Sequence, residues 1–169
     1  MAQPAPPKPP LAAVDTNVLL DLADGNERAW GAVETLRRRL KGGQIVVLPT
    51  VVQELVHLAE HGATERARRA ARRLVAEWKF VPLNFIPAGH GITERIADSL
   101  RARGLLPDEE VNDAFIVAES ALAGCTLLLS SDRHILEIPA VRLNPLLADA
   151  HVTAPLIASP RDIVRKFGG

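Results

Sequence analysis

The chain has 169 residues, of which 47% are hydrophobic, 24% charged and only 4% aromatic. This length and composition predict one soluble domain with a sizeable aliphatic core, and they exclude the disordered and fibrous classes. The formal net charge is zero, so the chain has no overall basic character, and binding to an anionic polymer would need a local patch or a metal ion.

The only cysteine, Cys125, excludes an internal disulfide and a cysteine-based zinc site, and its apolar neighbours predict a buried side chain. No apolar run approaches the ~18 residues that a membrane-spanning helix needs. Residues 1–10 lack the apolar centre of a signal peptide and predict a disordered proline-rich arm, which leaves residues 11–169 as a single domain. We therefore expect a cytoplasmic protein that does not associate with membranes.

The first half of the chain is predicted to alternate strands and helices. Short apolar runs bounded by turn residues predict strands, and apolar residues at helical spacing predict helices. The predicted elements are a strand over 11–14, a helix over 16–23 with Thr16 as its N-cap, a helix over 27–40, a strand over 44–48, a helix over 49–60, and an arginine-rich helix that Thr64 caps and that reaches Trp78.

The second half continues the alternation. The predicted elements are an extended segment over 80–85, helices over 92–103 and 108–123, a strand over 126–129, a short helix after Asp132, an irregular proline-containing stretch, and a last helix over 160–167 that Ser159 caps. This alternation predicts an α/β fold, with a central mainly parallel, Rossmann-like sheet between two layers of helices (α/β/α).

Four acidic residues are predicted to meet at one edge of this sheet. Asp15 ends the first predicted strand, and Glu54 lies in the first turn of the helix that follows the second. Asp113 lies near the start of the helix over 108–123, and Asp132 follows the strand over 126–129. Strand carboxyl ends and the N-termini of the following helices share one edge of a parallel sheet, where ligands bind.

Such a group of acids is expected to bind a cation. Four carboxylates in one crevice repel one another and stay ionised only if a cation neutralises them. Oxygen ligands without a cysteine or histidine cluster favour Mg²⁺ or Mn²⁺ over zinc. These ions activate water and stabilise charge on phosphoryl oxygens, which suits phosphodiester hydrolysis.

With these acids in place, the sequence resembles the PIN-domain family of metal-dependent ribonucleases, many of which are VapC-like toxins of toxin–antitoxin pairs. The resemblance extends from Leu11 to the closing helix. It is carried by four stretches in matching order and context: Val14-Asp15-Thr16-Asn17-Val18-Leu19, Val52-Gln53-Glu54-Leu55, Asn112-Asp113-Ala114-Phe115-Ile116-Val117-Ala118 and Leu127-Leu128-Leu129-Ser130-Ser131-Asp132.

The resemblance implies an endoribonuclease that leaves a 3′-hydroxyl and a 5′-phosphate, with Mg²⁺ or Mn²⁺ as its cofactor. Its catalytic, metal-binding tetrad would be Asp15, Glu54, Asp113 and Asp132. Asn17 and Ser130 would orient those carboxylates. The resemblance also implies a homodimer and, for a toxin, a small antitoxin whose C-terminal segment covers the acidic site and supplies an arginine.

Several of these residues also have purely structural interpretations. Asp15 and Asp132 could cap helices, and the helix dipole alone favours an acid in the position of Glu54. Glu109, one helical turn before Asp113, is a candidate extra ligand, although it also fits an acidic helix start.

Basic residues have two interpretations as well. His57 and His134 neighbour predicted site residues but are expected to be surface or packing residues. The arginine runs, at 37–39 and around Arg66, Arg69 and Arg73, are candidate contacts for an RNA backbone or simply solvated helix faces. Scarce aromatics argue against recognition of single strands by base stacking.

Other functional classes fit less well. A phosphatase or phosphoryl-transfer receiver usually needs an Asp-x-Asp pair or a lysine at a strand end. Here Asn17 occupies the position of the second aspartate, and no lysine follows a predicted strand. A non-catalytic PIN-like binding module is expected to lack one or more of the four acids, and all are present. Residues 137–158 and the proline-rich arm exceed a minimal PIN toxin, so a housekeeping RNA-processing nuclease remains open beside a toxin.

Overall fold

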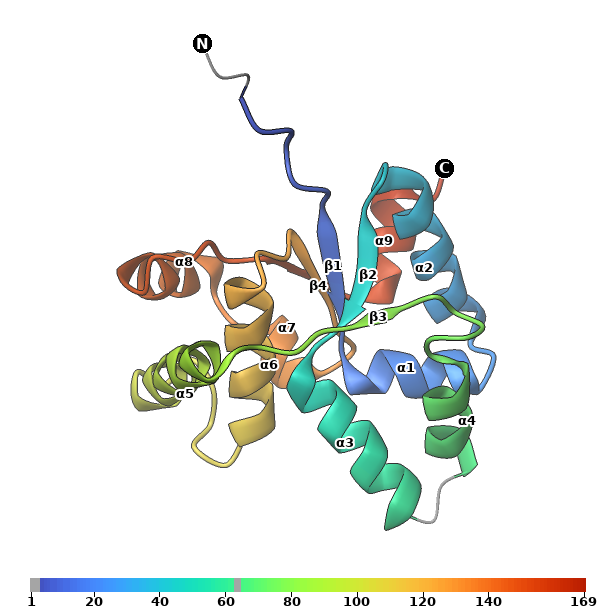
Figure 1. The fold of residues 1–169 in the computed structure, drawn as a ribbon, viewed down its shortest axis with the longest axis horizontal. Coiled ribbons are helices and arrows are strands. Elements are labelled where there is room, and N and C mark those ends of the chain that lie inside the picture. Colours follow the sequence, from blue (N-terminus) through green and yellow to red (C-terminus); the bar gives the residue numbers. More distant parts are fainter. Residues whose placement is uncertain (1–3, 63–64) are drawn as a thin grey trace.

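A five-stranded parallel sheet forms the centre of the molecule in the computed structural model, which describes residues 4–62 and 65–169 (Figure 1). The strands are β1 (Leu11–Val14), β2 (Gln44–Val47), β3 (Val81–Pro82), β4 (Leu127–Leu129) and β5 (Leu156–Ala158). They lie in the order β3-β2-β1-β4-β5, and each neighbouring pair is parallel. The predicted three-layer α/β/α fold is confirmed.

Helices cover both faces of the sheet and its carboxyl edge. Their bounds are α1 (Thr16–Ala23), α2 (Glu27–Arg39), α3 (Pro49–Glu60), α4 (Glu65–Arg73), α5 (Pro87–Ala102), α6 (Val111–Leu122), α7 (Arg133–Leu136), α8 (Ala140–Asp149) and α9 (Pro160–Phe167). The pair α2 and α9 packs on one side of the sheet, and the pair α5 and α6 packs on the other (Figure 1). Helices α1 and α3 leave from the carboxyl ends of β1 and β2.

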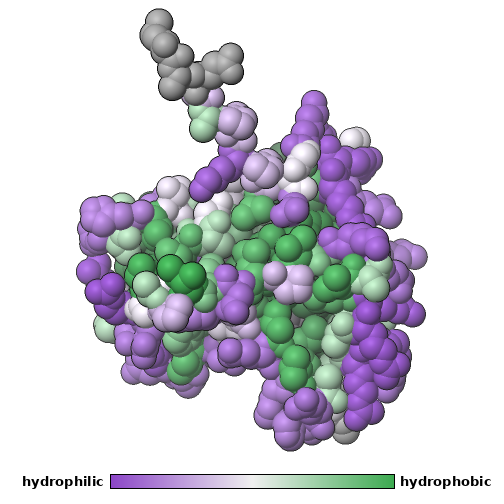
Figure 2. All heavy atoms as spheres, viewed as in Figure 1, coloured by the Kyte–Doolittle hydropathy of each residue, from purple (hydrophilic) through white to green (hydrophobic). Residues whose placement is uncertain are grey.

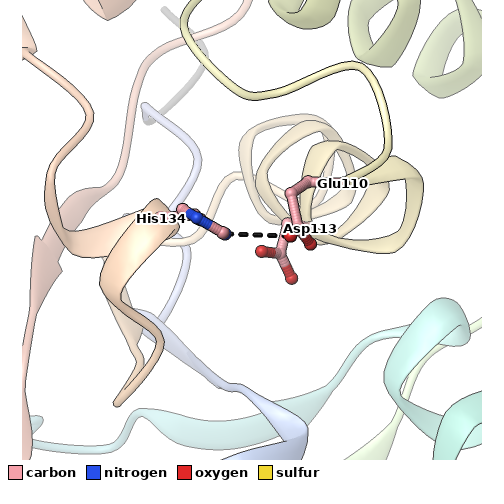
Figure 3. Close-up of side chains that lie close together, drawn as sticks. All are labelled: Glu110, Asp113 and His134. Atoms are coloured by element: carbon pink, nitrogen blue, oxygen red, sulfur yellow. Dashed lines mark ion pairs between the residues drawn. The ribbon is translucent and has the colours of Figure 1, made fainter.

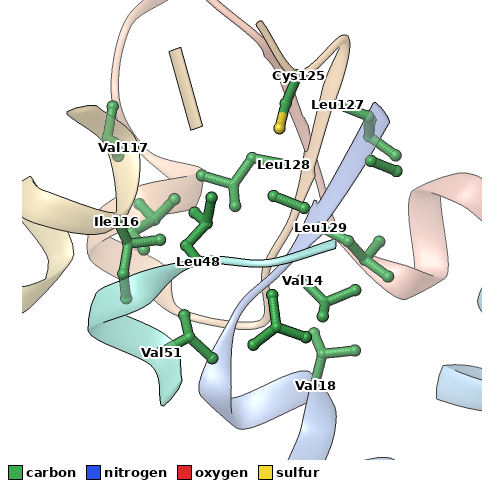
Figure 4. Close-up of a cluster of buried hydrophobic side chains, with 14 of the residues drawn as sticks. Val14, Val18, Leu48, Val51, Ile116, Val117, Cys125, Leu127, Leu128 and Leu129 are labelled. Atoms are coloured by element: carbon green, nitrogen blue, oxygen red, sulfur yellow. The ribbon is translucent and has the colours of Figure 1, made fainter. Parts of the chain in front are cut away.

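The core lies between these layers and is aliphatic. Val14, Leu128 and Leu129 are fully buried, as continuous apolar strands in a doubly covered parallel sheet require. They pack with Leu48 and other apolar side chains in the cluster of Figure 4. Cys125 is buried in the same cluster as predicted, and its burial raises the pKa of the thiol to about 12.

The outer surface is more polar than this core. On the face drawn in Figure 2, hydrophobic residues gather over the middle of the molecule, between hydrophilic residues on the flanking helices. Within residues 4–62 and 65–169, no helix combines the length and apolar character needed to cross a membrane.

Two predicted helix starts that shape the site are wrong. Asp15, not Thr16, is the N-cap of α1, because its carboxylate accepts a hydrogen bond from the Thr16 amide at 2.6 Å. Helix α6 begins at Val111 rather than at residue 108, since the amides of Glu110 and Val111 donate to carbonyls within the preceding turn. Asp113 therefore lies in the first turn of α6.

Other boundaries also differ from the prediction. Helix α5 begins at Pro87 rather than Ile92, because proline suits a first helical turn while the two following glycines obscure the helical pattern. Helix α4 ends at Arg73 instead of reaching Trp78, and β3 is only two residues long. The predicted cap Thr64 lies outside the described residues.

The stretch predicted as irregular is in fact ordered into α8 and β5. Pro145 stands inside α8, where a proline usually costs about 3 kcal/mol. Burial of Leu143, Leu146 and Leu147 offsets that cost. The final helix agrees with the prediction: Ser159 caps α9 through a reciprocal pair of hydrogen bonds with Asp162.

Candidate active site

The four predicted acids line one cavity at the carboxyl edge of the sheet. Asp15 and Asp132 follow β1 and β4, while α3 and α6 carry Glu54 and Asp113 to the same place. The cavity has a volume of about 350 Å³, and its other lining residues are Thr16, Asn17, His57, Leu58 and Asn112. Parallel topology therefore brings together acids that are distant in the sequence.

Asp15 is buried and is fixed by two hydrogen bonds. One carboxylate oxygen accepts from the Thr16 amide, and the other accepts from the Ser130 hydroxyl at 2.7 Å. Burial raises the pKa of Asp15 to about 6, although both hydrogen bonds act to lower it; the charges of Glu54 and Asp132 raise it further. Ser130 is fully buried and also accepts from the Asp132 amide at 3.0 Å, so one hydroxyl links two of the acids.

Ser130→Ala is expected to destabilise the protein by about 1–3 kcal/mol, because it leaves a buried carboxylate oxygen and an amide without a partner. Urea unfolding measures this change. The matched control is Ser131→Ala at the adjacent exposed position, which is expected to stay within about 0.5 kcal/mol of wild type. Equal stability of the two variants would contradict the role given to the Ser130 hydroxyl.

Glu54 is held by two residues that were not predicted to take part in the site. Its carboxylate accepts from the Thr16 hydroxyl and, at 2.8 Å, from the side-chain amide of Asn112. Both donors adjoin predicted acids in the sequence, which is the signal that could have identified them. Asn17 lines the same cavity but is exposed, and within residues 4–62 and 65–169 its side chain makes no hydrogen bond to the four acids.

Asp113 is half-buried, and its Oδ2 atom is buried without a hydrogen-bond partner among the described residues. Burial raises the pKa of Asp113 to about 8, and the charges of Asp132, Asp15, Glu110 and Glu54 add to this effect. A buried carboxylate oxygen that lacks a donor is the kind of atom that a bound cation satisfies. The site therefore fits a divalent ion.

The structure brings Glu110, rather than Glu109, to Asp113. Because α6 begins only at Val111, Glu109 lies in the preceding turn and is exposed. Glu110, Asp113 and His134 each offer a ligand atom, and these atoms lie within 4.8 Å of one another (Figure 3). His134 is exposed, which agrees with the predicted surface or packing role, and only the packing of α7 beside α6 reveals its acidic neighbours.

Asp132 caps α7 and lines the cavity at the same time. Its carboxylate accepts from the His134 amide at 2.7 Å, which agrees with the helix-cap interpretation. The histidine that lines the cavity, His57, stacks on His61 with ring centroids 4.7 Å apart. The two interpretations of Asp132 are thus compatible.

Glu119 is a buried acid that the sequence patterns also missed. Its carboxylate on α6 accepts from the Thr50 amide at 3.0 Å and from the Thr50 hydroxyl at 2.8 Å. Thr50 lies one helical turn before Glu54 on α3. Glu119 therefore fixes the start of the helix that carries Glu54 against the helix that carries Asp113.

The arginines predicted to contact RNA have partners within the protein. Arg66 and Arg69 both pair with Asp24 at 3.4 Å, and Arg73 pairs with Glu77 at 3.4 Å. In the other arginine run, Arg37 and Arg39 donate to the backbone carbonyls of Trp78 and Phe167.

The acidic cavity lies at the carboxyl edge of a parallel sheet, which is where open α/β sheets generally bind ligands. The PIN-domain family model matches residues 12–141, so the chain belongs to the PIN-domain family, whose members are nucleases and hence hydrolases. This confirms the resemblance drawn from the sequence. A search of curated proteins finds no significant match.

Comparison with solved structures gives the same fold. A chain in the crystal structure of VapBC2 from Rickettsia felis, bound to a DNA fragment from their promoter, superposes with a TM-score of 0.61 at 12% sequence identity. The match covers 88% of the present chain and 98% of the Rickettsia chain. At this identity the similarity establishes a shared fold.

Proposed function

We propose that this protein is a metal-dependent endoribonuclease that hydrolyses RNA at the cavity of Asp15, Glu54, Asp113 and Asp132. The observation that carries the proposal is the Asp113 Oδ2 atom, which is buried and unpartnered among the described residues, in a cavity lined by three more acids. Membership of a nuclease family supports the reaction class. All four acids are present, which argues against a non-catalytic binding module.

The four acids offer only oxygen ligands, which suit Mg²⁺ or Mn²⁺. When bound, such an ion lowers the pKa of water and stabilises negative charge on phosphoryl oxygens. The protein holds its carboxylates in position for this chemistry, because Ser130 orients Asp15, while Thr16 and Asn112 orient Glu54. Asn17, at the rim, stays a predicted support for the same carboxylates.

We further propose that the protein acts as a toxin with a small antitoxin partner and forms a homodimer. The family resemblance and the presence of the structural neighbour in a VapBC complex support this assignment. A housekeeping RNA-processing nuclease is the second candidate, favoured by the extra length of residues 137–158. Co-purification of the protein with the product of an adjacent reading frame would favour the toxin.

The nuclease proposal is tested by incubating the full chain with end-labelled RNA in Mn²⁺, Mg²⁺ or EDTA. We expect cleavage with either ion, with 5′-phosphates on the new ends, and none in EDTA. Equal cleavage in EDTA would refute metal dependence. Cleavage of a DNA of matched sequence instead of RNA would refute the assigned substrate.

The protein also needs basic residues to hold the RNA backbone. Arg28 and Arg161 line a cavity of about 200 Å³ with Ser131, next to Asp132 in the chain. Asp21 lines the same cavity. Neither Arg28 nor Arg161 has an ion-pair partner within residues 4–62 and 65–169. We therefore expect these two guanidinium groups to be more available to phosphates than Arg66, Arg69 and Arg73.

The Arg28→Gln/Arg161→Gln double variant is expected to weaken RNA binding and to reduce the slope of log K against log salt by about 1.4, or about 0.7 for each lost phosphate contact. The inactive Asp113→Asn protein, a fluorescent single-stranded RNA and a salt series provide the measurement. Arg66→Gln/Arg69→Gln is the matched comparison and is expected to change the slope less. The reverse order would favour Arg66 and Arg69 as the RNA contacts.

A further inference from the structure

We propose that Glu110, Asp113 and His134 form a mixed nitrogen–oxygen ligand set, in which His134 makes the acidic site prefer Mn²⁺ over Mg²⁺. The proposal rests on the proposed function in one respect, because it assigns two further ligands to the metal site of the nuclease. It concerns metal binding, however, and can be tested without RNA.

Two elements that are distant in sequence build this ligand set. Glu110 immediately precedes α6, Asp113 lies in its first turn, and His134 is the second residue of α7. Figure 3 shows the imidazole of His134 facing both carboxylates, and the three ligand atoms lie within 4.8 Å of one another. A divalent ion with ligands at about 2.1 Å holds opposite ligand atoms about 4.2 Å apart, so small side-chain rotations would complete the geometry.

The contacts around His134 tie it to the acidic cavity. Its backbone amide donates to the carboxylate of Asp132, which belongs to the predicted tetrad. Its Nδ1 atom lies 3.0 Å from a carboxylate oxygen of Glu110. The backbone of His134 is therefore held beside a tetrad acid that lines the cavity, and its imidazole is directed toward the start of α6 by Glu110.

The surroundings of Asp113 also favour a cation at this place. The Oδ2 atom of Asp113 is buried, and no hydrogen-bond donor within residues 4–62 and 65–169 reaches it. Glu110 and His134 contact each other, but neither donates a hydrogen bond to the Oδ2 atom of Asp113. An ion bound between the three side chains would contact a carboxylate oxygen of Asp113, a carboxylate oxygen of Glu110 and a ring nitrogen of His134 together.

The nitrogen atom decides which ion is preferred. Mg²⁺ requires oxygen ligands and retains its water, whereas an imidazole nitrogen is a favourable ligand for transition metals. The tetrad supplies only carboxylates, which accept both ions. We therefore expect His134 to add affinity for Mn²⁺ and to contribute little for Mg²⁺.

The test measures the binding of Mn²⁺ and Mg²⁺ to the full-length wild-type, His134→Gln and His57→Gln proteins. His57→Gln is the matched control, because His57 is the histidine that lines the acidic cavity and it lies outside the ligand set. We expect His134→Gln to weaken Mn²⁺ binding at least about tenfold and to leave Mg²⁺ binding within about twofold. Electron spin echo spectra of bound Mn²⁺ should contain an imidazole ¹⁴N signal in wild type and His57→Gln but not in His134→Gln.

Retained Mg²⁺ binding shows that His134→Gln is folded, so the result is interpretable. Unchanged Mn²⁺ affinity and a persistent ¹⁴N signal in His134→Gln would overturn the proposal, as would an equal loss of affinity for both ions. If Mn²⁺ binds as expected but RNA is not cleaved, the ligand set stands and the proposed nuclease function fails. If RNA is cleaved with Mg²⁺ while His134→Gln binds Mn²⁺ like wild type, the nuclease stands and this inference fails.

Discussion

Asp113→Asn is expected to lower the rate of RNA cleavage by about 10³-fold or more. Asparagine has nearly the same size as aspartate but lacks the charge, and Asp113 carries the unpartnered oxygen of the site. A bound ion supplies several kcal/mol of transition-state stabilisation, and each 1.36 kcal/mol corresponds to a factor of ten in rate. Single-turnover cleavage of a labelled RNA in saturating Mn²⁺ measures the effect.

The control is Asp108→Asn, which removes a carboxylate from the exposed turn before α6 and outside the cavity. We expect this variant to cleave RNA within about twofold of wild type, since surface substitutions away from special features change stability by at most about 0.5 kcal/mol. Asp113→Asn itself should melt at or above the wild-type temperature without metal, because it removes the cost of burying a charged carboxylate and relieves repulsion among the acids. Comparable cleavage by the two variants would remove Asp113 from the active site.

The sequence predicts the acidic cavity well because sheet topology determines it. Once β1 and β4 are recognised from their continuous apolar residues, Asp15 and Asp132 must stand at the same edge. The start of α6 is less predictable, because acidic residues suit both a turn and a first helical turn. That ambiguity led to Glu109 as the candidate ligand, whereas the backbone geometry places Glu110 beside Asp113.

The contacts that orient the acids depend on tertiary structure. Thr16 and Glu54 are 38 residues apart, and Thr50 and Glu119 are 69 residues apart, so no local pattern indicates these pairs. The missed helix α8 has a different cause: Pro145 breaks the helical pattern, and only burial of the neighbouring leucines makes the helix favourable.

Without divalent ions, the free energy of unfolding is expected to fall as the pH rises from about 4 to about 8. In the folded protein the pKa values of Asp15 and Asp113 are raised from 3.8 to about 6 and about 8. Over this range the folded state binds more protons than the unfolded chain, so removing protons destabilises it. The stabilisation that comes from the raised pKa values of Asp15 and Asp113 is fully present below pH 3.8, and it is lost as the pH rises through the folded-state pKa values.

Mn²⁺ is expected to reverse this dependence. The ion binds the deprotonated carboxylates, so its stabilising effect grows with pH and reaches about 2.7 kcal/mol when its free concentration is 100 times Kd. Urea unfolding at pH 5 and pH 8, in EDTA or in Mn²⁺, measures both effects.

In the same experiment, the Asp113→Asn variant distinguishes the effect of the acidic cavity on stability from the effect of titrating groups elsewhere in the protein. It should reduce the pH slope in EDTA without abolishing it, because burial also raises the pKa of Glu119, which remains in the variant. It should also lose most of the stabilisation by Mn²⁺, whereas Asp108→Asn should keep both effects. A wild-type protein whose stability in EDTA does not decline between pH 5 and pH 8 would show that burial and the neighbouring charges do not raise the pKa values of Asp15 and Asp113 in the folded protein, and the reason to expect a cation at this edge of the sheet would disappear with those shifts.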